Sequence, residues 1–148
     1  MRHMRDTVHM TWIHWSLLSA LAAAATAIFG KIGVARIDSN LATAIRTTVI
    51  LVFSWGIALA TRQPGALSRI GPRTWIFLGL SGLATGASWL CYYRALQLGP
   101  ASKVAPIDKL SVALVIVLAA LFLGEPLTLR KCIGGLLIVA GAVTLAWE

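Results

Sequence analysis

Acidic side chains, cysteines and histidines are scarce in this chain of 148 residues. Five Asp and Glu face thirteen Lys and Arg, and there are two cysteines and three histidines. Cys91 and Cys132 both lie in apolar stretches and signal neither a disulfide framework nor a metal site. His3, His9 and His14 lack metal-ligand spacing on one helical face, and no Ser/His/Asp or paired-carboxylate set can be assembled. The sequence therefore predicts a protein that is no enzyme and needs no cofactor.

Long polar segments are missing as well. Charged residues make up only 12% of the chain, whereas 58% of it is hydrophobic and the mean hydropathy is +0.82. A helix of about 20 apolar residues, rising about 1.5 Å per residue, crosses a hydrocarbon core about 30 Å thick. The chain holds five such stretches, which leaves roughly 40 residues for ends and loops, too few for a soluble domain. The sequence therefore predicts an all-α integral membrane protein with five transmembrane helices.

The chain divides into a short basic N-terminal tail, residues 1–11, and a transmembrane domain, residues 12–148. Breaker residues and caps set the expected helices at about Trp12–Phe29, Leu41–Ala60, Trp75–Leu98, Ala101–Gly124 and Leu127–Trp147. The basic start and the small residues of the first stretch also fit a signal peptide. Its apolar run, however, is longer than the roughly 7 to 15 residues of a signal peptide, and Trp12, His14 and Trp15 interrupt it. We therefore interpret it as the first span.

The net charge of +8 needs a partner, but the sequence does not point to nucleic acid. The thirteen Lys and Arg occur as scattered singles and pairs between apolar runs, not as a basic patch. Anionic lipid headgroups and topology signals account for them more simply. Membrane lipids are the partners that this pattern predicts.

The third apolar stretch has two distinct faces. Hydroxyls spaced 4, 3 and 4 residues apart form a polar stripe: Ser81, Thr85, Ser88 and Tyr92. Glycines form a second face that suits close helix packing: Gly79, Gly82 and Gly86. Each hydroxyl could instead bond to the backbone carbonyl four residues earlier. Four hydroxyls in register, ending in a tyrosine, favour a water-lined groove.

The fourth apolar stretch begins with three charges, Lys103, Asp108 and Lys109. A charge near the bilayer centre costs about 2.5 to 3.5 kcal/mol on insertion scales, so these side chains are expected to face partners or water. Pro106 lies among them, and there the helix either kinks or begins afresh, which frees carbonyl groups. Asp108 and Ser111 are three residues apart on one face. The pattern predicts an ion or substrate path.

Because successive spans alternate in direction, several charged positions share one side of the membrane. They are Lys31, Arg36, Asp38, Arg46, Arg94, Lys103, Asp108 and Lys109. Cations outnumber anions there, so a positive potential is expected to remain for an anionic or zwitterionic solute. The alternative is that each side chain reaches separately to lipid phosphate.

Two motifs resemble a known family. The third stretch ends in Tyr93-Arg94-Ala95-Leu96, and Leu123-Gly124-Glu125-Pro126-Leu127-Thr128 joins the last two stretches. Both are similar to the EamA-type repeat of the drug/metabolite transporter superfamily, and the likeness covers about 12–147. Most relatives carry two such repeats, giving about ten helices in inverted orientation, with solute passing between helices three and four of each. This chain resembles the single-repeat branch, which implies a homodimer, with an antiparallel arrangement open.

The resemblance also implies which residues line a central cavity. They are Ser81, Thr85, Ser88, Trp89, Tyr92 and Arg94 on the third helix, with Lys103, Asp108, Lys109 and Ser111 on the fourth. Small multidrug proteins of the superfamily place a coupling glutamate in their first helix, whereas the first helix here has no carboxylate. Asp108 is the acid left for that role, with Arg46, Arg94 and Lys109 as its partners and anion-attracting groups.

The expected function is secondary, ion-coupled transport of a small polar, anionic or zwitterionic metabolite across a bacterial or archaeal cytoplasmic membrane. Two alternatives remain open: an accessory membrane subunit that transports nothing itself, and a lipid-carrier flippase subunit. Basic residues divide almost evenly between the two sides of the membrane, which permits insertion in both orientations. Four of those on the side opposite the N-terminus lie within helices, which favours a cytoplasmic N-terminus.

Overall fold

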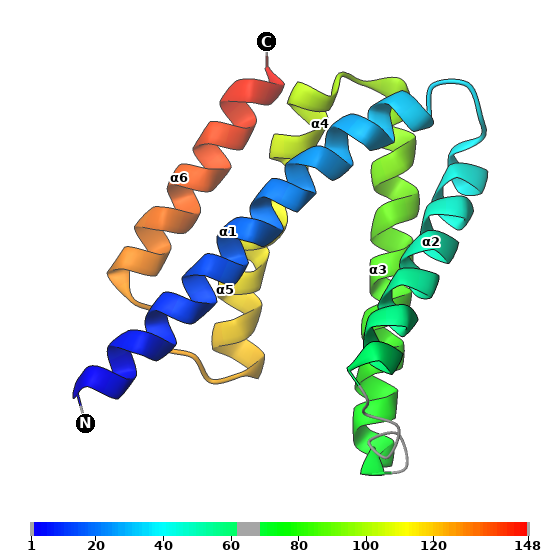
Figure 1. Cartoon of the computed structure of the whole chain (residues 1–148). Coiled ribbons are helices and arrows are strands. Elements are labelled where there is room, and N and C mark those ends of the chain that lie inside the picture. Colours follow the sequence, from blue (N-terminus) through cyan, green and yellow to red (C-terminus); the bar gives the residue numbers. More distant parts are fainter. Residues whose placement is uncertain (1, 62–68, 148) are drawn as a thin grey trace.

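The structure, a computed structural model, describes residues 2–61 and 69–147, with side chains described from Trp12 onward. This part of the chain holds helices and no strand (Figure 1). The helices are α1 (Arg2–Gly33), α2 (Ser39–Ala60), α3 (Pro72–Leu98), α4 (Ala101–Asp108), α5 (Leu110–Phe122) and α6 (Leu129–Ala146). Five spans are long and apolar enough to cross a membrane, α4 and α5 together forming one of them. The predicted all-α, five-span membrane fold is confirmed, whereas the boundary between residues 11 and 12 stays a prediction.

Local chemistry explains where the helices begin. The Asp38 carboxylate accepts hydrogen bonds from the backbone N–H groups of Asn40 and Leu41, at 2.9 and 3.1 Å, and so caps α2. The Thr128 hydroxyl accepts from the backbone N–H of Lys131 at 3.3 Å and caps α6. Pro72 occupies the first turn of α3, where its missing N–H costs nothing. These caps fix the helix starts within about three residues of the predicted ones.

The fourth span is two helices and not one. Its backbone breaks at Lys109, between the end of α4 and the start of α5. Pro106 has no N–H to donate to the Ser102 carbonyl. Further along, the N–H of Lys109 donates to the Pro106 carbonyl three residues back at 3.0 Å, whereas a regular α-helix would use the carbonyl four residues back. The span ends at Gly124, whose positive φ of 67° suits glycine. Of the two predicted outcomes at Pro106, a kink or a fresh start, the structure has the fresh start, three residues later.

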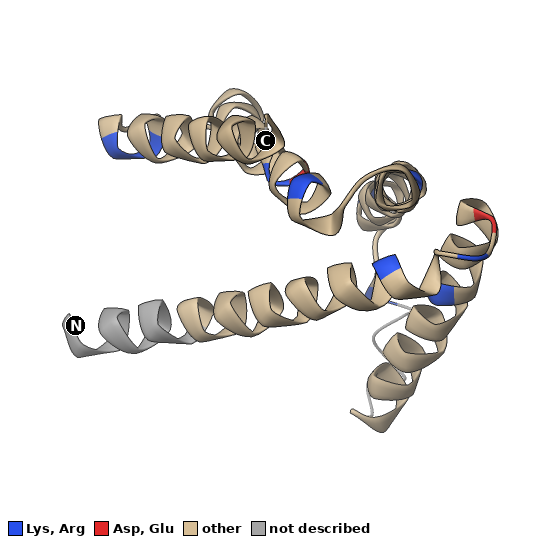
Figure 2. Cartoon of the chain, turned by 90° about the horizontal axis from the view of Figure 1, so that it is seen from above, with Lys and Arg blue, Asp and Glu red and all other residues tan. Residues whose placement is uncertain are grey.

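The spans form two hairpins that α1 joins. In Figure 1, α2 and α3 make one antiparallel pair, and α4 and α5 make another with α6. The C-terminal half of α1 packs on α3 and α4 near the turn between those two helices. Viewed from above in Figure 2, α1 and α6 lie apart along most of their length. In Figure 1 the two hairpins diverge away from the α3–α4 turn.

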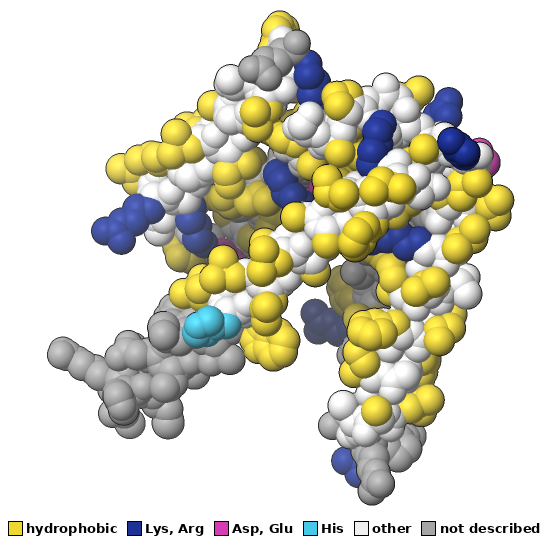
Figure 3. Space-filling model, turned by 45° about the horizontal axis from the view of Figure 1, so that its top comes forward, with side chains coloured by type: hydrophobic (Ala, Val, Ile, Leu, Met, Phe, Trp, Pro, Cys, Tyr) yellow, Lys and Arg dark blue, Asp and Glu magenta, His cyan; other side chains and the backbone are white. Residues whose placement is uncertain are grey.

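The buried core is small and lies at that turn. Its cluster is Val34, Ala42, Tyr93 and Leu96, with Val34 and Leu96 fully buried. Most large apolar side chains along the spans are exposed instead, and Figure 3 shows them covering the outer surfaces of the helices. A chain that spans a membrane meets lipid or another protein at such surfaces, so the exposure follows from the fold.

The glycine face of α3 is not packed within the chain. A side chain added at Gly79, Gly82 or Gly86 would meet nothing within 4 Å. Close approach occurs instead at Gly30 of α1, where an added methyl would lie 3.2 Å from the Tyr93 hydroxyl. The predicted close-packing ridge thus has no partner helix in the described part of the protomer, and it is free to meet lipid or another chain.

Candidate functional site

Asp108 lines a cavity where α3 faces α4. The cavity has a volume of about 270 Å³, and Ser88 and Tyr92 of α3 line it together with Asp108. Ser88 and Tyr92 are four residues apart and so share one face of their helix. Asp108 is the last residue of α4, directly before the break at Lys109. The break therefore places the carboxylate beside hydroxyl groups from a different helix.

Asp108 is also the one carboxylate within the five spans. It pairs with the neighbouring Lys109, whose ammonium nitrogen lies 3.2 Å from a carboxylate oxygen. The Asp108 and Lys109 side chains are 35% and 56% exposed, so this pair is not sealed inside the protein. The carboxylate is therefore not enclosed by the chain itself, and Lys109 is its ion-pair partner among the described residues.

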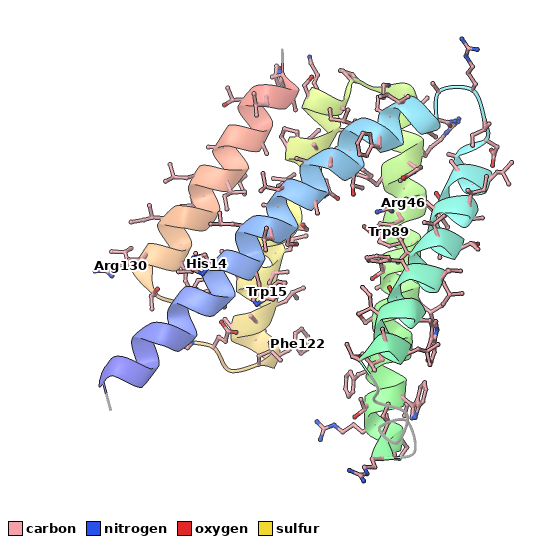
Figure 4. The ribbon with its side chains drawn as sticks, in the orientation of Figure 1. His14, Trp15, Arg46, Trp89, Phe122 and Arg130 are labelled. Atoms are coloured by element: carbon pink, nitrogen blue, oxygen red, sulfur yellow. The ribbon has the colours of Figure 1, made fainter. Side chains whose placement is uncertain are left out.

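Arg46 occupies a second position on the inner side of the α2–α3 hairpin (Figure 4). Its guanidinium carbon lies 4.0 Å from the centre of the Trp89 ring and 5.4 Å from that of Tyr93. Trp89 and Tyr93 are four residues apart, so one face of α3 presents both rings. Tyr92, which lines the Asp108 cavity, lies three residues after Trp89, which contacts Arg46. The two charges thus flank one segment of α3.

Several predicted charges serve the fold. Lys31 donates hydrogen bonds to the Leu96 and Gly99 carbonyls, at 2.5 and 2.8 Å, which satisfies the end of α3. Asp38 is engaged as the cap of α2. Lys31 and Asp38 are therefore engaged in local contacts of the fold, and the common membrane side of the predicted charges stays a prediction.

Arg94 lies on a different side of α3 from Asp108. Its guanidinium donates to the Gln97 side-chain oxygen at 3.0 Å, and Gln97 donates in turn to the carbonyls of Val34 and Ile37, at 3.2 and 2.7 Å. Arg94 and Asp38 line a separate open cavity. The structure thus joins Arg94 to the α1–α2 turn and not to the Asp108 cavity.

The hydroxyl stripe of α3 divides in two. The Thr85 hydroxyl donates to the Ser81 carbonyl at 2.8 Å, which is the local backbone bond weighed as the alternative. Ser88 and Tyr92 lie in the Asp108 cavity. Of the remaining predicted positions, Ser81, Trp89, Lys103, Lys109 and Ser111 are not among the residues lining that cavity. Their place on a transport path stays a prediction.

Sequence reasoning missed three of the residues that matter here. Tyr93 belongs to the family motif, but its contact with Arg46 is not predicted from the sequence, although its spacing of four residues from Trp89 is visible there. Gln97 and the role of Lys31 join residues more than 60 positions apart, and no local pattern reports such contacts. The sequence offers only a weak signal for these contacts. Lys31 follows Gly30 and Gln97 shortly precedes Gly99-Pro100, so both lie at helix ends.

Three relatives resemble the chain. It is 56% identical over 136 residues to the "uncharacterized transporter in cobO 3′ region" of a Sinorhizobium species, covering 92% of this chain and 96% of that protein. It is 31% identical over 133 residues to the uncharacterized transporter YvbV of Bacillus subtilis, covering 85% of this chain and 44% of the relative. It is 33% identical over 101 residues to the probable 4-amino-4-deoxy-L-arabinose-phosphoundecaprenol flippase subunit ArnE of an Enterobacter species. The alignment covers 66% of this chain and 94% of that protein.

No solved structure gives a significant match. The model of the EamA-like transporter family matches residues 10–147, which is nearly the whole chain. That range includes all five spans from Trp12 onward, the Asp108 cavity and the Arg46 position. This multi-pass membrane protein therefore belongs to the EamA-like transporter family.

Proposed function

We propose that the protein is a secondary transporter that moves a small polar, anionic or zwitterionic metabolite across the cytoplasmic membrane of a bacterium or archaeon. The observation that carries the proposal is the cavity where Asp108 meets Ser88 and Tyr92 beside a break in a membrane span. Interrupted spans are where transporters commonly place solute and coupling-ion sites, since the break frees backbone groups for binding. The protein performs transport and not catalysis.

Asp108 is the coupling or gating group in this proposal. When it is ionised it pairs with Lys109; when it takes up a proton or a solute cation, Lys109 is released. Because Lys109 is the hinge residue between α4 and α5, the exchange of partners acts directly on the break. Ser88 and Tyr92 supply hydroxyl contacts for the solute.

Two copies of the chain complete the pathway. The chain exposes 12004 Å² of surface, whereas a compact soluble protein of 15.8 kDa exposes about 7,300 Å². The excess is surface that lipid or a second chain can cover. The chain also covers only 44% of YvbV, so that relative is long enough to hold two such repeats. We infer a homodimer in which the open sides of the two hairpin pairs face each other.

The test is uptake into proteoliposomes that contain the purified protein, measured with and without a pH gradient over a panel of radiolabelled metabolites. Asp108→Asn keeps the size and a hydrogen-bonding end of the side chain but removes its ionisation. We expect this variant to fold and to lose the dependence of uptake on the pH gradient. Glu125→Gln is the matched control, because Glu125 pairs with Lys131 in the loop between α5 and α6. Unchanged pH dependence in Asp108→Asn would reject the coupling role.

A second candidate is a flippase subunit for a lipid carrier. The match to ArnE favours it, since 94% of that small protein aligns with this chain. In this case the occupant of the path carries a polyprenyl phosphate, and the partner is a different membrane protein. Polyprenyl phosphate that binds the purified protein and suppresses metabolite uptake would favour the flippase. A purified homodimer that conducts metabolite without another subunit would exclude the accessory role.

A further inference from the structure

A third cavity lies between α1, α2 and α3, next to the core, and Tyr93 forms part of its wall. Its volume is about 340 Å³. The walls are apolar, with Phe29 of α1, Ile37 of the α1–α2 turn and Ile45 of α2 among them. Arg46 is the charged residue among those lining it. The cavity is therefore an apolar pocket with a single cation in its wall.

The Arg46 guanidinium contacts two aromatic rings but has one nitrogen without a partner. Its central carbon lies 4.0 Å from the centre of the Trp89 ring and 5.4 Å from that of the Tyr93 ring, within cation–π range of both. Its Nη1 atom is buried and has no hydrogen-bond partner. A guanidinium forms strong, directional bonds to an oxyanion through the N–H groups along its edge. The aromatic contacts therefore leave a guanidinium nitrogen of Arg46 without a hydrogen-bond acceptor.

The described part of the chain offers Arg46 no counter-ion. The ion pairs there join Lys109 to Asp108 and Lys131 to Glu125, and Asp38 is occupied as the cap of α2. An unpaired cation within a membrane span is costly, and buried charges are normally paired. The described residues therefore leave Arg46 open to an anion from elsewhere.

We propose that this cavity binds an organic oxyanion, with its phosphate or carboxylate group on the edge of Arg46 and its apolar body along Phe29, Ile37 and Ile45. The Tyr93 hydroxyl, which lies against Gly30, provides a second donor at the same wall. Arg46 excludes cations from the cavity because it occupies the aromatic face that an organic cation would use. The binding site itself does not depend on the proposed function. Only the identification of the bound anion with the transported solute rests on that function.

The test is isothermal titration of the protein in phosphatidylcholine nanodiscs with hexyl phosphate. Hexyltrimethylammonium, a cation with the same alkyl chain, serves as the matched ligand control. We expect saturable binding of hexyl phosphate that the cation does not displace. Arg46→Gln should weaken it about 30-fold or more, because it removes one partner of a buried charged hydrogen bond. Arg73→Gln, an arginine over Phe77 at the far end of α3, should leave the affinity unchanged.

Arg46→Lys keeps the positive charge but lacks the planar edge of the guanidinium. It is the variant to measure if Arg46→Gln does not fold. We expect it to weaken binding at least about tenfold. Absence of saturable binding to the wild type, displacement by the cation, or wild-type affinity in Arg46→Lys would each overturn the site.

A further arm separates a lipid headgroup from a soluble anion as the source of the oxyanion. Part of the phosphatidylcholine is replaced by phosphatidic acid. Loss of the hexyl phosphate titration shows that the headgroup of the lipid fills the cavity, whereas an unchanged titration assigns it to a soluble anion.

Binding and transport fail separately. Asp108→Asn should retain hexyl phosphate binding while it loses coupling, since Asp108 lies outside this cavity. Binding without any transport would leave the Arg46 site standing and reject the transporter. Uptake that is insensitive to Arg46→Gln would reject the site as part of the transport path and leave the transporter standing.

Discussion

Charged side chains inside the spans of this protein have three different roles, which their neighbours distinguish. Lys31 bonds to two carbonyls and completes a helix end. Asp108 and Lys109 pair with each other at a helix break. Arg46 stacks on rings and has an unpartnered nitrogen. The first role is structural, whereas the other two leave charge available, so a mutation should affect stability in one case and transport or binding in the others.

Lys31→Met tests the structural role. The substitution keeps the length and the apolar stem of the side chain, but it leaves the Leu96 and Gly99 carbonyls without their donor. We expect the free energy of unfolding to fall by about 1 to 3 kcal/mol, the cost of unsatisfied partly buried polar groups. Reversible unfolding in mixed detergent micelles, followed by circular dichroism, measures it.

Lys131→Met is the matched control for Lys31→Met. It removes an exposed pair with Glu125, so its effect should stay within about 1 kcal/mol. Equal losses from the two substitutions would contradict the structural role of Lys31.

At the scale of elements, the break in the fourth span is the main feature that sets the site. Pro106 starts it by removing a backbone donor, and the chain resumes its helix at Leu110. The break brings Asp108 to α3 and leaves Lys109 as the connecting residue. A continuous helix would satisfy more backbone bonds, so the interruption trades stability for a bend at the site.

Pro106→Ala tests whether the break in the fourth span lowers stability and supports transport. Alanine restores the missing N–H and lets α4 continue into α5, so we expect a higher unfolding temperature together with slower uptake. Thermal unfolding and proteoliposome uptake measure the two effects. Pro72→Ala is the control, because Pro72 stands in the first turn of α3 and interrupts nothing. Faster or unchanged uptake in Pro106→Ala would show that the break has no part in transport.

Sequence patterns predicted the elements better than the contacts between them. Apolar length and the caps at Asp38 and Thr128 place the spans, since both signals are local. The meeting of Asp108 with Ser88 and Tyr92 was expected through the family resemblance, and the structure brings them together. The pairing of Thr85 with a backbone carbonyl was open, because a hydroxyl stripe fits either outcome. Contacts between distant segments, such as Gln97 with the α1–α2 turn, have no periodic signal.

At the scale of the whole molecule, the protomer has one small core and an unpacked glycine face. Gly79, Gly82 and Gly86 line one side of α3 with nothing against them in the described chain. Glycine faces allow helices of different chains to approach closely in a membrane, where packing and not the hydrophobic effect drives association. A bulky residue there would therefore act on assembly and not on the fold of the protomer.

Gly82→Leu tests that expectation. We predict helix content and protomer stability close to wild type, with the dimer weakened so that it dissociates at higher protein concentration. Chemical crosslinking and light scattering in detergent measure the assembly. Gly33→Leu, on α1 and also without contacts within 4 Å, is the matched control. If Gly82→Leu lowered protomer stability and left the dimer intact, the face would pack within the chain.

The last prediction concerns how the two copies are oriented. An odd number of spans, five, places the two ends of the chain on opposite sides of the membrane. Two copies inserted in opposite directions then reproduce the inverted repeat on which alternating access depends. Copies inserted in the same direction would place both Asp108 cavities at one depth and one side, with no exchange of roles between them. We therefore predict an antiparallel homodimer.

Reporter fusions at the C-terminus decide the orientation. One reporter is active only in the cytoplasm and the other only outside it, and we expect both to give strong signals. Basic residues near the ends of the spans offer the control, since extra lysines in one loop should shift the ratio of the two signals as loop charge directs insertion. Where the added lysines leave few copies in one orientation and uptake falls, a second copy fixed in that minority orientation should restore uptake. A strong signal from a single reporter would mean one orientation and a parallel or mixed assembly.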